Sequence, residues 1–194
     1  MKRREIDYFG IVIGLVIGAL FGYFLSLKIN YENTDVVNGD GQEGNVYLLQ
    51  IIKSDNINSI NSTLSTVDFN YEIIEDNKMF YVYTAISLKK EELENKKDEY
   101  ANYGFNPVIR SEYIIDWSDK FANSQDKKTF YNEAINNLFN SLNNKTIIIS
   151  EKYYDEPIDF EVFSNLTILQ AIKNQKIKEQ IELELFHQLF KKLN

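Results

Sequence analysis

Runs of apolar residues bounded by turn residues predict β-strands in the middle of the chain. Four such runs lie at 46–53, 69–75, 79–86 and 106–115. Two stretches between them read as helices, at about 56–64 and 88–103, and the segment Asp76-Asn77-Lys78 predicts a hairpin turn. The order β-α-β-β-α-β predicts an α+β domain of ferredoxin-like or RNP-like topology, with a four-stranded antiparallel sheet and both helices on one face.

Residues at the ends of the two predicted helices support these boundaries. Ser54 or Asp55 can cap the first helix, and Ser87 can cap the second. Gly104 suits the C-terminal end of the second helix, because glycine readily adopts the left-handed conformation found there.

The pattern changes after residue 115 and predicts a helical extension. Residues 127–142 carry apolar side chains on one helix face, and the β-branched run 146–149 predicts a short strand or the entry to a loop. Residues 151–157 predict a loop. Asp159 can cap a long helix that ends near residue 193 and could be broken near Asn174. The apolar side of this helix is broad: Ile177, Ile181, Leu185, Phe186, Leu189, Phe190 and Leu193.

The most apolar part of the chain lies near its N-terminus. Residues 8–27 contain no charged side chain and, as a helix, are long enough to cross a hydrocarbon core of about 30 Å. Three basic residues precede this run, so the sequence predicts a single-pass protein of the cell membrane with a cytoplasmic N-terminus. A cleaved signal peptide is the alternative, but it would normally have a shorter apolar region and a small-x-small cleavage site.

Within this run, glycines recur at every fourth position: Gly10, Gly14, Gly18 and Gly22. On a helix they would form a ridge without side chains, which favours packing against a second copy or another membrane protein. The alternative is that glycine is simply common in membrane helices.

Composition and charge exclude several classes of function. Acidic residues outnumber basic ones, 29 to 21, and the resulting net charge of −8 disfavours nucleic acid and other anionic polymers. There is no cysteine and one histidine, His187, so we expect no disulfide, metal or cofactor site. Acidic pairs such as Glu91-Glu92 fit a solvated helix face better than the facing carboxylates of a glycosidase, so we expect no catalytic residues and no enzyme activity.

Three short segments between residues 46 and 115 follow a family pattern. Tyr47-Leu48-Leu49-Gln50-Ile51 places a glutamine among apolar residues in the first strand. Phe80-Tyr81-Val82-Tyr83 leads to Ser87 and acidic residues, and Tyr103-Gly104-Phe105 precedes the last strand. In these features the segment resembles the SPOR domain, a family named from sporulation and cell-division proteins. It departs from the family at Ile52, where a glycine is expected, and at Thr84-Ala85, where Gly-Pro is expected.

The resemblance implies binding to peptidoglycan, especially to glycan strands stripped of stem peptides, in division or sporulation. Strand alternation places Leu48, Gln50 and Ile52 on one face. The family register adds Phe80 and Val82, and Arg110 is a possible donor to the sugar. The alternative is a membrane-anchored scaffold or protein-interaction module, in which the C-terminal helices cover this face. The predicted parts are a cytoplasmic segment (1–7), a transmembrane helix (8–27), a flexible linker (28–45), a SPOR-like domain (46–115) and a helical region (116–194).

Overall fold

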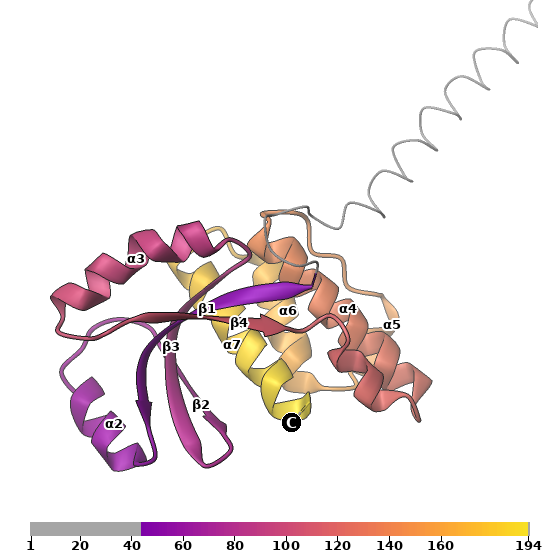
Figure 1. Cartoon of the computed structure of the whole chain (residues 1–194). Helices are drawn as coiled ribbons and strands as arrows, with labels where there is room; N and C mark the ends of the chain where they lie inside the picture. The colour runs from indigo at the N-terminus through magenta and orange to yellow at the C-terminus, as the bar shows by residue number, and fades with distance from the viewer. Residues whose placement is uncertain (1–43, 194) are drawn as a thin grey trace, which may run out of the picture. The chain divides into compact units, whose positions relative to one another are not determined.

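The structure, a computed structural model, describes residues 44–193. Its first part has the predicted order of strands and helices (Figure 1). The strands pair as an antiparallel sheet in the order β2-β3-β1-β4, and α2 and α3 pack on one face of it. The elements are β1 (Asn45–Ser54), α2 (Ile57–Leu64), β2 (Glu72–Asp76), β3 (Met79–Ser87), α3 (Lys90–Asn102) and β4 (Val108–Tyr113).

Local interactions explain where these elements begin and end. The cap of α2 is Asn56 rather than the predicted Ser54 or Asp55, because its side-chain oxygen accepts the backbone N–H groups of the next turn at 3.0 and 3.3 Å. Asn77 and Lys78 both have positive φ, of 50° and 64°, which is the backbone of a tight hairpin turn. Gly104 has a φ of 86° just after α3, as predicted from its position.

The second part of the described chain is helical, and its boundaries refine the prediction. The predicted helix from Asp159 to residue 193 is two helices, and the predicted loop 151–157 contains one short helical turn. Asp159 does cap the first of the two, because its Oδ1 accepts the N–H groups of Glu161 and Val162 at 3.1 and 3.2 Å. The elements are η1 (Trp117–Phe121), α4 (Gln125–Leu142), α5 (Lys152–Asp155), α6 (Phe160–Ala171) and α7 (Gln175–Leu193).

Helix α7 joins the helical part to the sheet. It packs against β2 and β3 on one side and against α4 and α6 on the other (Figure 1). The sheet consequently has two cores. One core lies under α2 and α3, and the other contains Leu48, Ile86 and Tyr83 of the sheet together with Phe186 and Leu189 of α7. The C-terminal helices therefore cover part of the sheet face that the sequence offered as a binding surface.

The prediction of a membrane-spanning architecture needs correction. Among residues 44–193, no helix combines the length and the apolar character needed to cross a membrane. Even α7, with 19 residues, alternates its apolar side chains with lysines and glutamates. The run 8–27 and its four glycines lie outside the described residues. The fold class is therefore corrected to α+β with a four-stranded antiparallel sheet and C-terminal helices, and the predicted single-pass location and lipid-bilayer partner are not supported.

The β-branched run 146–149 forms no strand, yet its backbone is paired. Asn137 of α4 is 1% exposed, and its side-chain amide donates to the carbonyl of Ile148 at 2.7 Å and accepts the N–H of the same residue at 3.0 Å. One buried amide thus satisfies two backbone groups, as a neighbouring strand would.

We expect Asn137→Ala to lower the free energy of unfolding by about 1–3 kcal/mol, because it leaves both groups of Ile148 without their partner. Urea denaturation of the full chain measures this. The matched control is Asn136→Ala, since the neighbouring Asn136 is exposed and should change stability little. Equal effects of the two substitutions would show that the contact with Ile148 does not stabilise the fold.

Candidate functional site

The predicted binding face is divided between the two sides of the sheet. In the pairing of β1 with β3, Leu48 lies opposite Ile86, Gln50 opposite Tyr83 and Ile52 opposite Val82. Strand β3 therefore has one extra residue between the first two pairs, and β1 has one extra residue between the last two. Each extra residue is a β-bulge, which interrupts the strict alternation of side chains. Prediction from uninterrupted alternation therefore fails beyond Gln50.

The apolar residues predicted to bind the glycan are divided between the two cores. Leu48 belongs to the core under α7, while Val82 belongs to the core under α2 and α3, and both are fully buried. Ile52 and Phe80 pack against the α2 and α3 side. These four side chains do not form a common ligand-binding face, because the bulges and the packing of α7 assign them to two cores.

The structure brings together Gln50 and Arg110, which the sequence analysis named separately as glycan-binding residues. The Nε of Arg110 donates a hydrogen bond to Oε1 of Gln50. The guanidinium carbon also lies 5.6 Å from the centre of the Tyr81 ring, and the amine of Lys53 lies 5.4 Å from the same ring. Arg110 is exposed, whereas Gln50 is only 6% exposed. We call Gln50, Tyr81 and Arg110 the arginine platform.

Sequence reasoning missed Tyr81 although it lies in the quoted β3 segment. With Phe80 and Val82 assigned to the binding face, strand alternation placed Tyr81 on the opposite face, under α2 and α3. In the structure, Tyr81 packs with Tyr83 on the side of α7. The two tyrosine rings stack with their centres 6.3 Å apart and an angle of 14°. No signal in the sequence alone marks the two bulges that decide this.

A cavity of about 70 Å³ adjoins the arginine platform. Apolar side chains of β1, β2 and α7 form one part of its wall, and Tyr81, Tyr83, Arg110, Asp76 and Glu112 form the other. Burial raises the pKa of the Glu112 carboxyl; the charge of Asp76 raises it further, and the positive charge of Arg110 acts in the opposite direction. Burial, with the charge of Glu112 next in importance, raises the pKa of Tyr83. Two carboxyl groups, those of Asp76 and Glu112, thus share this small cavity with one guanidinium.

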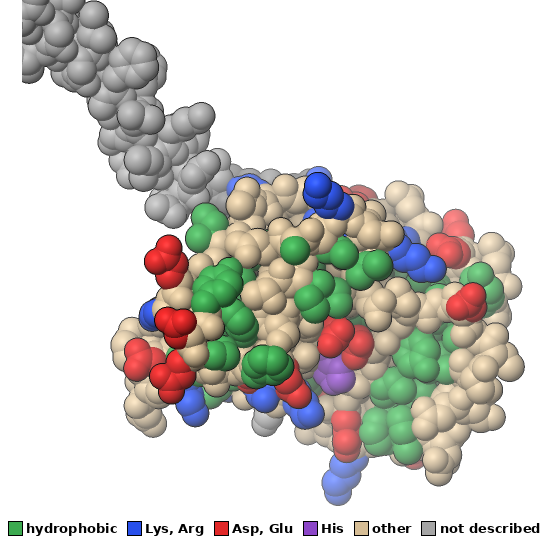
Figure 2. Space-filling view, turned by 180° about the vertical axis from the view of Figure 1, so that it is seen from behind, with side chains coloured by type: hydrophobic (Ala, Val, Ile, Leu, Met, Phe, Trp, Pro, Cys, Tyr) green, Lys and Arg blue, Asp and Glu red, His purple; other side chains and the backbone are tan. Residues whose placement is uncertain are grey.

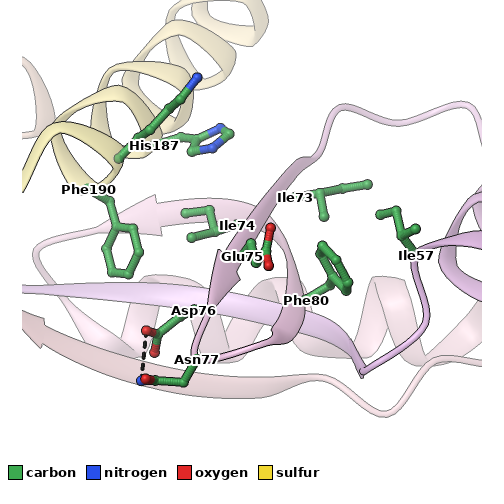
Figure 3. A pocket seen from close by; sticks show the side chains of 10 residues that line it. Ile57, Ile73, Ile74, Glu75, Asp76, Asn77, Phe80, His187 and Phe190 are labelled. Atoms are coloured by element: carbon green, nitrogen blue, oxygen red, sulfur yellow. Dashed lines mark hydrogen bonds between the residues drawn. The ribbon is translucent and has the colours of Figure 1, made fainter. Parts of the chain in front are cut away.

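A larger groove, about 820 Å³, lies next to this cavity along β2 (Figure 3). Ile74, Asp76 and Phe190 line both spaces, so the two are adjacent. In Figure 3, Ile74 and Phe190 lie on one side of the hairpin, and Ile73 and Phe80 lie on the other. The groove therefore follows the outer edge of the sheet from one face towards the other.

His187 lies at the rim of this groove. Its Nδ1 is 2.6 Å from a carboxylate oxygen of Glu72, so the contact joins α7 to β2. Figure 2 shows the histidine at the surface beside acidic side chains. Within residues 44–193, no three acidic, histidine or cysteine side chains gather in a way that could hold a metal ion.

Comparison with known proteins adds one similarity. No protein-family model matches the chain, and no curated protein matches it. Among solved structures, the chain is similar to the solution structure of the peptidoglycan-binding domain of the B. subtilis cell wall lytic enzyme CwlC, at 16% identity and a TM-score of 0.31. The match covers 37% of this chain and 95% of that one. At these values the similarity does not define a function, and membership of the SPOR family stays a prediction.

Proposed function

We propose that this protein binds a cell-wall glycan, without catalysis, at the arginine platform. The observation that carries the proposal is the exposed guanidinium of Arg110, which Gln50 and the Tyr81 ring hold in one orientation. Only its Nε–H is used by Gln50, and the other guanidinium N–H groups can donate to sugar hydroxyl or acetamido oxygens. A fixed donor array binds with less loss of side-chain freedom than a mobile one.

The adjoining spaces favour a polymer over a small solute. The groove along β2 is within the range of about 300–1,000 Å³ that ligand pockets commonly have. A chain of sugars bound at Arg110 could pass Phe190 and continue along β2, where the lining contains both apolar and polar side chains. The net charge of −8 favours a neutral or cationic polymer over an anionic one.

A role in division or sporulation, and a preference for glycan strands without stem peptides, rest on the SPOR resemblance alone. Both are part of the proposal. They add a specific expectation, namely that removal of stem peptides increases binding.

The test is sedimentation of the full chain with purified cell-wall sacculi, before and after amidase removal of stem peptides. We expect the protein to bind the stripped glycan. We expect Arg110→Ala to weaken this binding about ten- to a hundredfold, because losing a hydrogen bond to a charged group changes the dissociation constant by about that factor. The control is Lys90→Ala, which removes an exposed cation from α3 on the opposite side of the sheet. Unchanged binding by Arg110→Ala, or no binding by a folded protein, would refute the proposal.

A second candidate is a protein-interaction module, and one observation favours it. Phe186 and Leu189 bury the part of the sheet face around Leu48, which leaves a narrower surface for a glycan than an open sheet would offer. If the folded protein binds neither preparation of sacculi, the protein-interaction module becomes the favoured function for the groove along β2.

A further inference from the structure

The cavity next to the arginine platform contains three polar groups whose pairing is incomplete. We call Asp76, Tyr83 and Glu112 the acidic niche. They come from the end of β2, the middle of β3 and β4, and the apolar floor beneath them includes Leu48 and Phe186. The niche is separate from the contact between Gln50 and Arg110, but Arg110 lies at its rim.

Glu112 is the first of these groups. It is half-buried, and within the described residues it makes no hydrogen bond and no ion pair with another side chain. The carboxylate of Asp76 acts on it with a charge of the same sign, and Asp76 itself receives a hydrogen bond at 2.9 Å from the amide of Asn77. Two carboxylates thus face one guanidinium, which leaves an excess negative charge in a partly buried place. Such a charge is costly unless it is paired.

Tyr83 supplies independent evidence. Its side chain is only 6% exposed, it lines the cavity, and its hydroxyl makes no hydrogen bond with another side chain among residues 44–193. The hydroxyl oxygen is therefore free to accept a hydrogen bond from a group that enters the cavity. Glu112, Arg110 and Asp76, whose charges act on the pKa of this hydroxyl, line the same cavity as Tyr83.

These groups together suit one kind of ligand atom. A primary ammonium group carries one positive charge and three N–H donors, and the niche offers two carboxylates and a phenol oxygen as acceptors. The cavity volume of about 70 Å³ is roughly twice the 30 Å³ that a water molecule occupies in the liquid, so it admits an amine and its carbon but not a sugar ring. The ring of an amino sugar would stay outside, next to the exposed Arg110.

We propose that the acidic niche binds a free primary amine, and therefore that the preferred glycan carries de-N-acetylated amino sugars. This inference rests on the proposed glycan binding. An N-acetylated sugar presents a neutral acetamide at the same place, which brings no positive charge and a bulkier group. The excess of acidic residues over the whole chain, 29 against 21 basic ones, favours such a cationic polymer at longer range.

The test compares ligands that differ in this amine. Calorimetric titration of the full chain uses a glucosamine tetramer, an N-acetylglucosamine tetramer and a short lysine-containing peptide, at a pH where the amines are protonated. We expect the glucosamine tetramer to bind about ten- to a hundredfold more tightly than its acetylated counterpart, because a hydrogen bond that involves a charged group changes affinity by about that factor. The peptide tests whether an amine without a sugar is sufficient, and we expect it to bind more weakly than the glucosamine tetramer.

Two variants locate the effect. Glu112→Gln keeps the shape of the side chain and removes its charge, so it should abolish the preference while leaving binding of the acetylated tetramer unchanged. Tyr83→Phe removes only the hydroxyl and should reduce the preference less. The matched control is Glu75→Gln on the same hairpin, because Glu75 lines the larger groove and not the niche, and it should preserve the preference.

The outcomes separate this inference from the proposed function. Equal binding of the two tetramers, or an unchanged preference in Glu112→Gln, would overturn the amine site while glycan binding stands. If neither tetramer binds but the peptide does, and Glu112→Gln loses it, the niche is an amine site and the glycan proposal fails. If none of the three ligands binds to the folded protein, both proposals fail.

Discussion

Phe186→Ala is expected to lower the free energy of unfolding by about 3–5 kcal/mol, the usual cost of removing a buried aromatic side chain. Phe186 is 1% exposed and belongs to the core that joins α7 to Leu48, Tyr83 and Ile86 of the sheet. It also contacts Trp117, with ring centres 5.7 Å apart. The substitution would leave a cavity between the sheet and the helical part, where little can rearrange to fill it.

Urea denaturation of the full chain, followed by circular dichroism, measures this effect. The matched control is Phe160→Ala, because Phe160 is 73% exposed at the start of α6 and its loss should change stability by less than about 1 kcal/mol. A loss below about 1 kcal/mol for Phe186→Ala would contradict the packing of α7 on the sheet.

Asp159→Ala is expected to destabilise the protein by about 2–4 kcal/mol at neutral pH. Its carboxylate caps α6, and the loss of such a cap costs about 1 kcal/mol. The hydroxyl of Tyr131 donates to the same carboxylate at 2.9 Å in a buried place, and leaving it without an acceptor costs about 1–3 kcal/mol more.

The same residue predicts a pH dependence. Burial by itself would raise the pKa of Asp159, but the amine of Lys192, the N–H of Val162 and the hydroxyl of Tyr131 outweigh burial and lower it. The unfolded chain therefore takes up this proton at a higher pH than the folded one. The stabilisation is complete above the unfolded pKa of about 3.9 and is lost as the pH falls through that value towards the folded pKa.

Denaturation of the wild type and Asp159→Ala at a series of pH values tests both statements. Between about pH 5 and pH 3, the wild type should lose more stability than the variant, so that the difference between them narrows. The control is Asp155→Ala, which removes an exposed carboxylate a few residues away and should follow the wild type. A difference that is constant with pH would contradict the role of the Asp159 charge.

The order of strands and helices between residues 45 and 113 could be predicted because each depends on local pattern. The hairpin at Asn77-Lys78 and the end of α3 near Gly104 are set by the backbone preferences of one or two residues, and the cap at Asp159 is set by the hydrogen bonds of one side chain. Boundaries were less certain where several polar residues compete, as at Asn56, which caps α2 in place of its two neighbours.

The composition of the candidate site was predictable only in part. Gln50 and Arg110 were named separately as glycan-binding residues, and the structure places them in contact, while their role in binding stays a prediction. Tyr81 and the acidic niche were not predicted, because two β-bulges shift the side-chain alternation between β1 and β3. Strict alternation along a strand cannot predict where a bulge occurs. Leu48 and Val82, by contrast, were expected at the ligand and are core residues on opposite sides of the sheet.

The sequence by itself determined the order of most elements and the acidic character that limits the choice of ligand, since these follow from local propensity and composition. Which face of the sheet stays open was decided by tertiary structure. The apolar side of α7 could have met solvent, a partner or the sheet, and only packing brings Phe186 onto Leu48. The burial of Glu112 and the charges around it likewise exist only after the four strands assemble into the sheet, because they depend on residues distant in the chain.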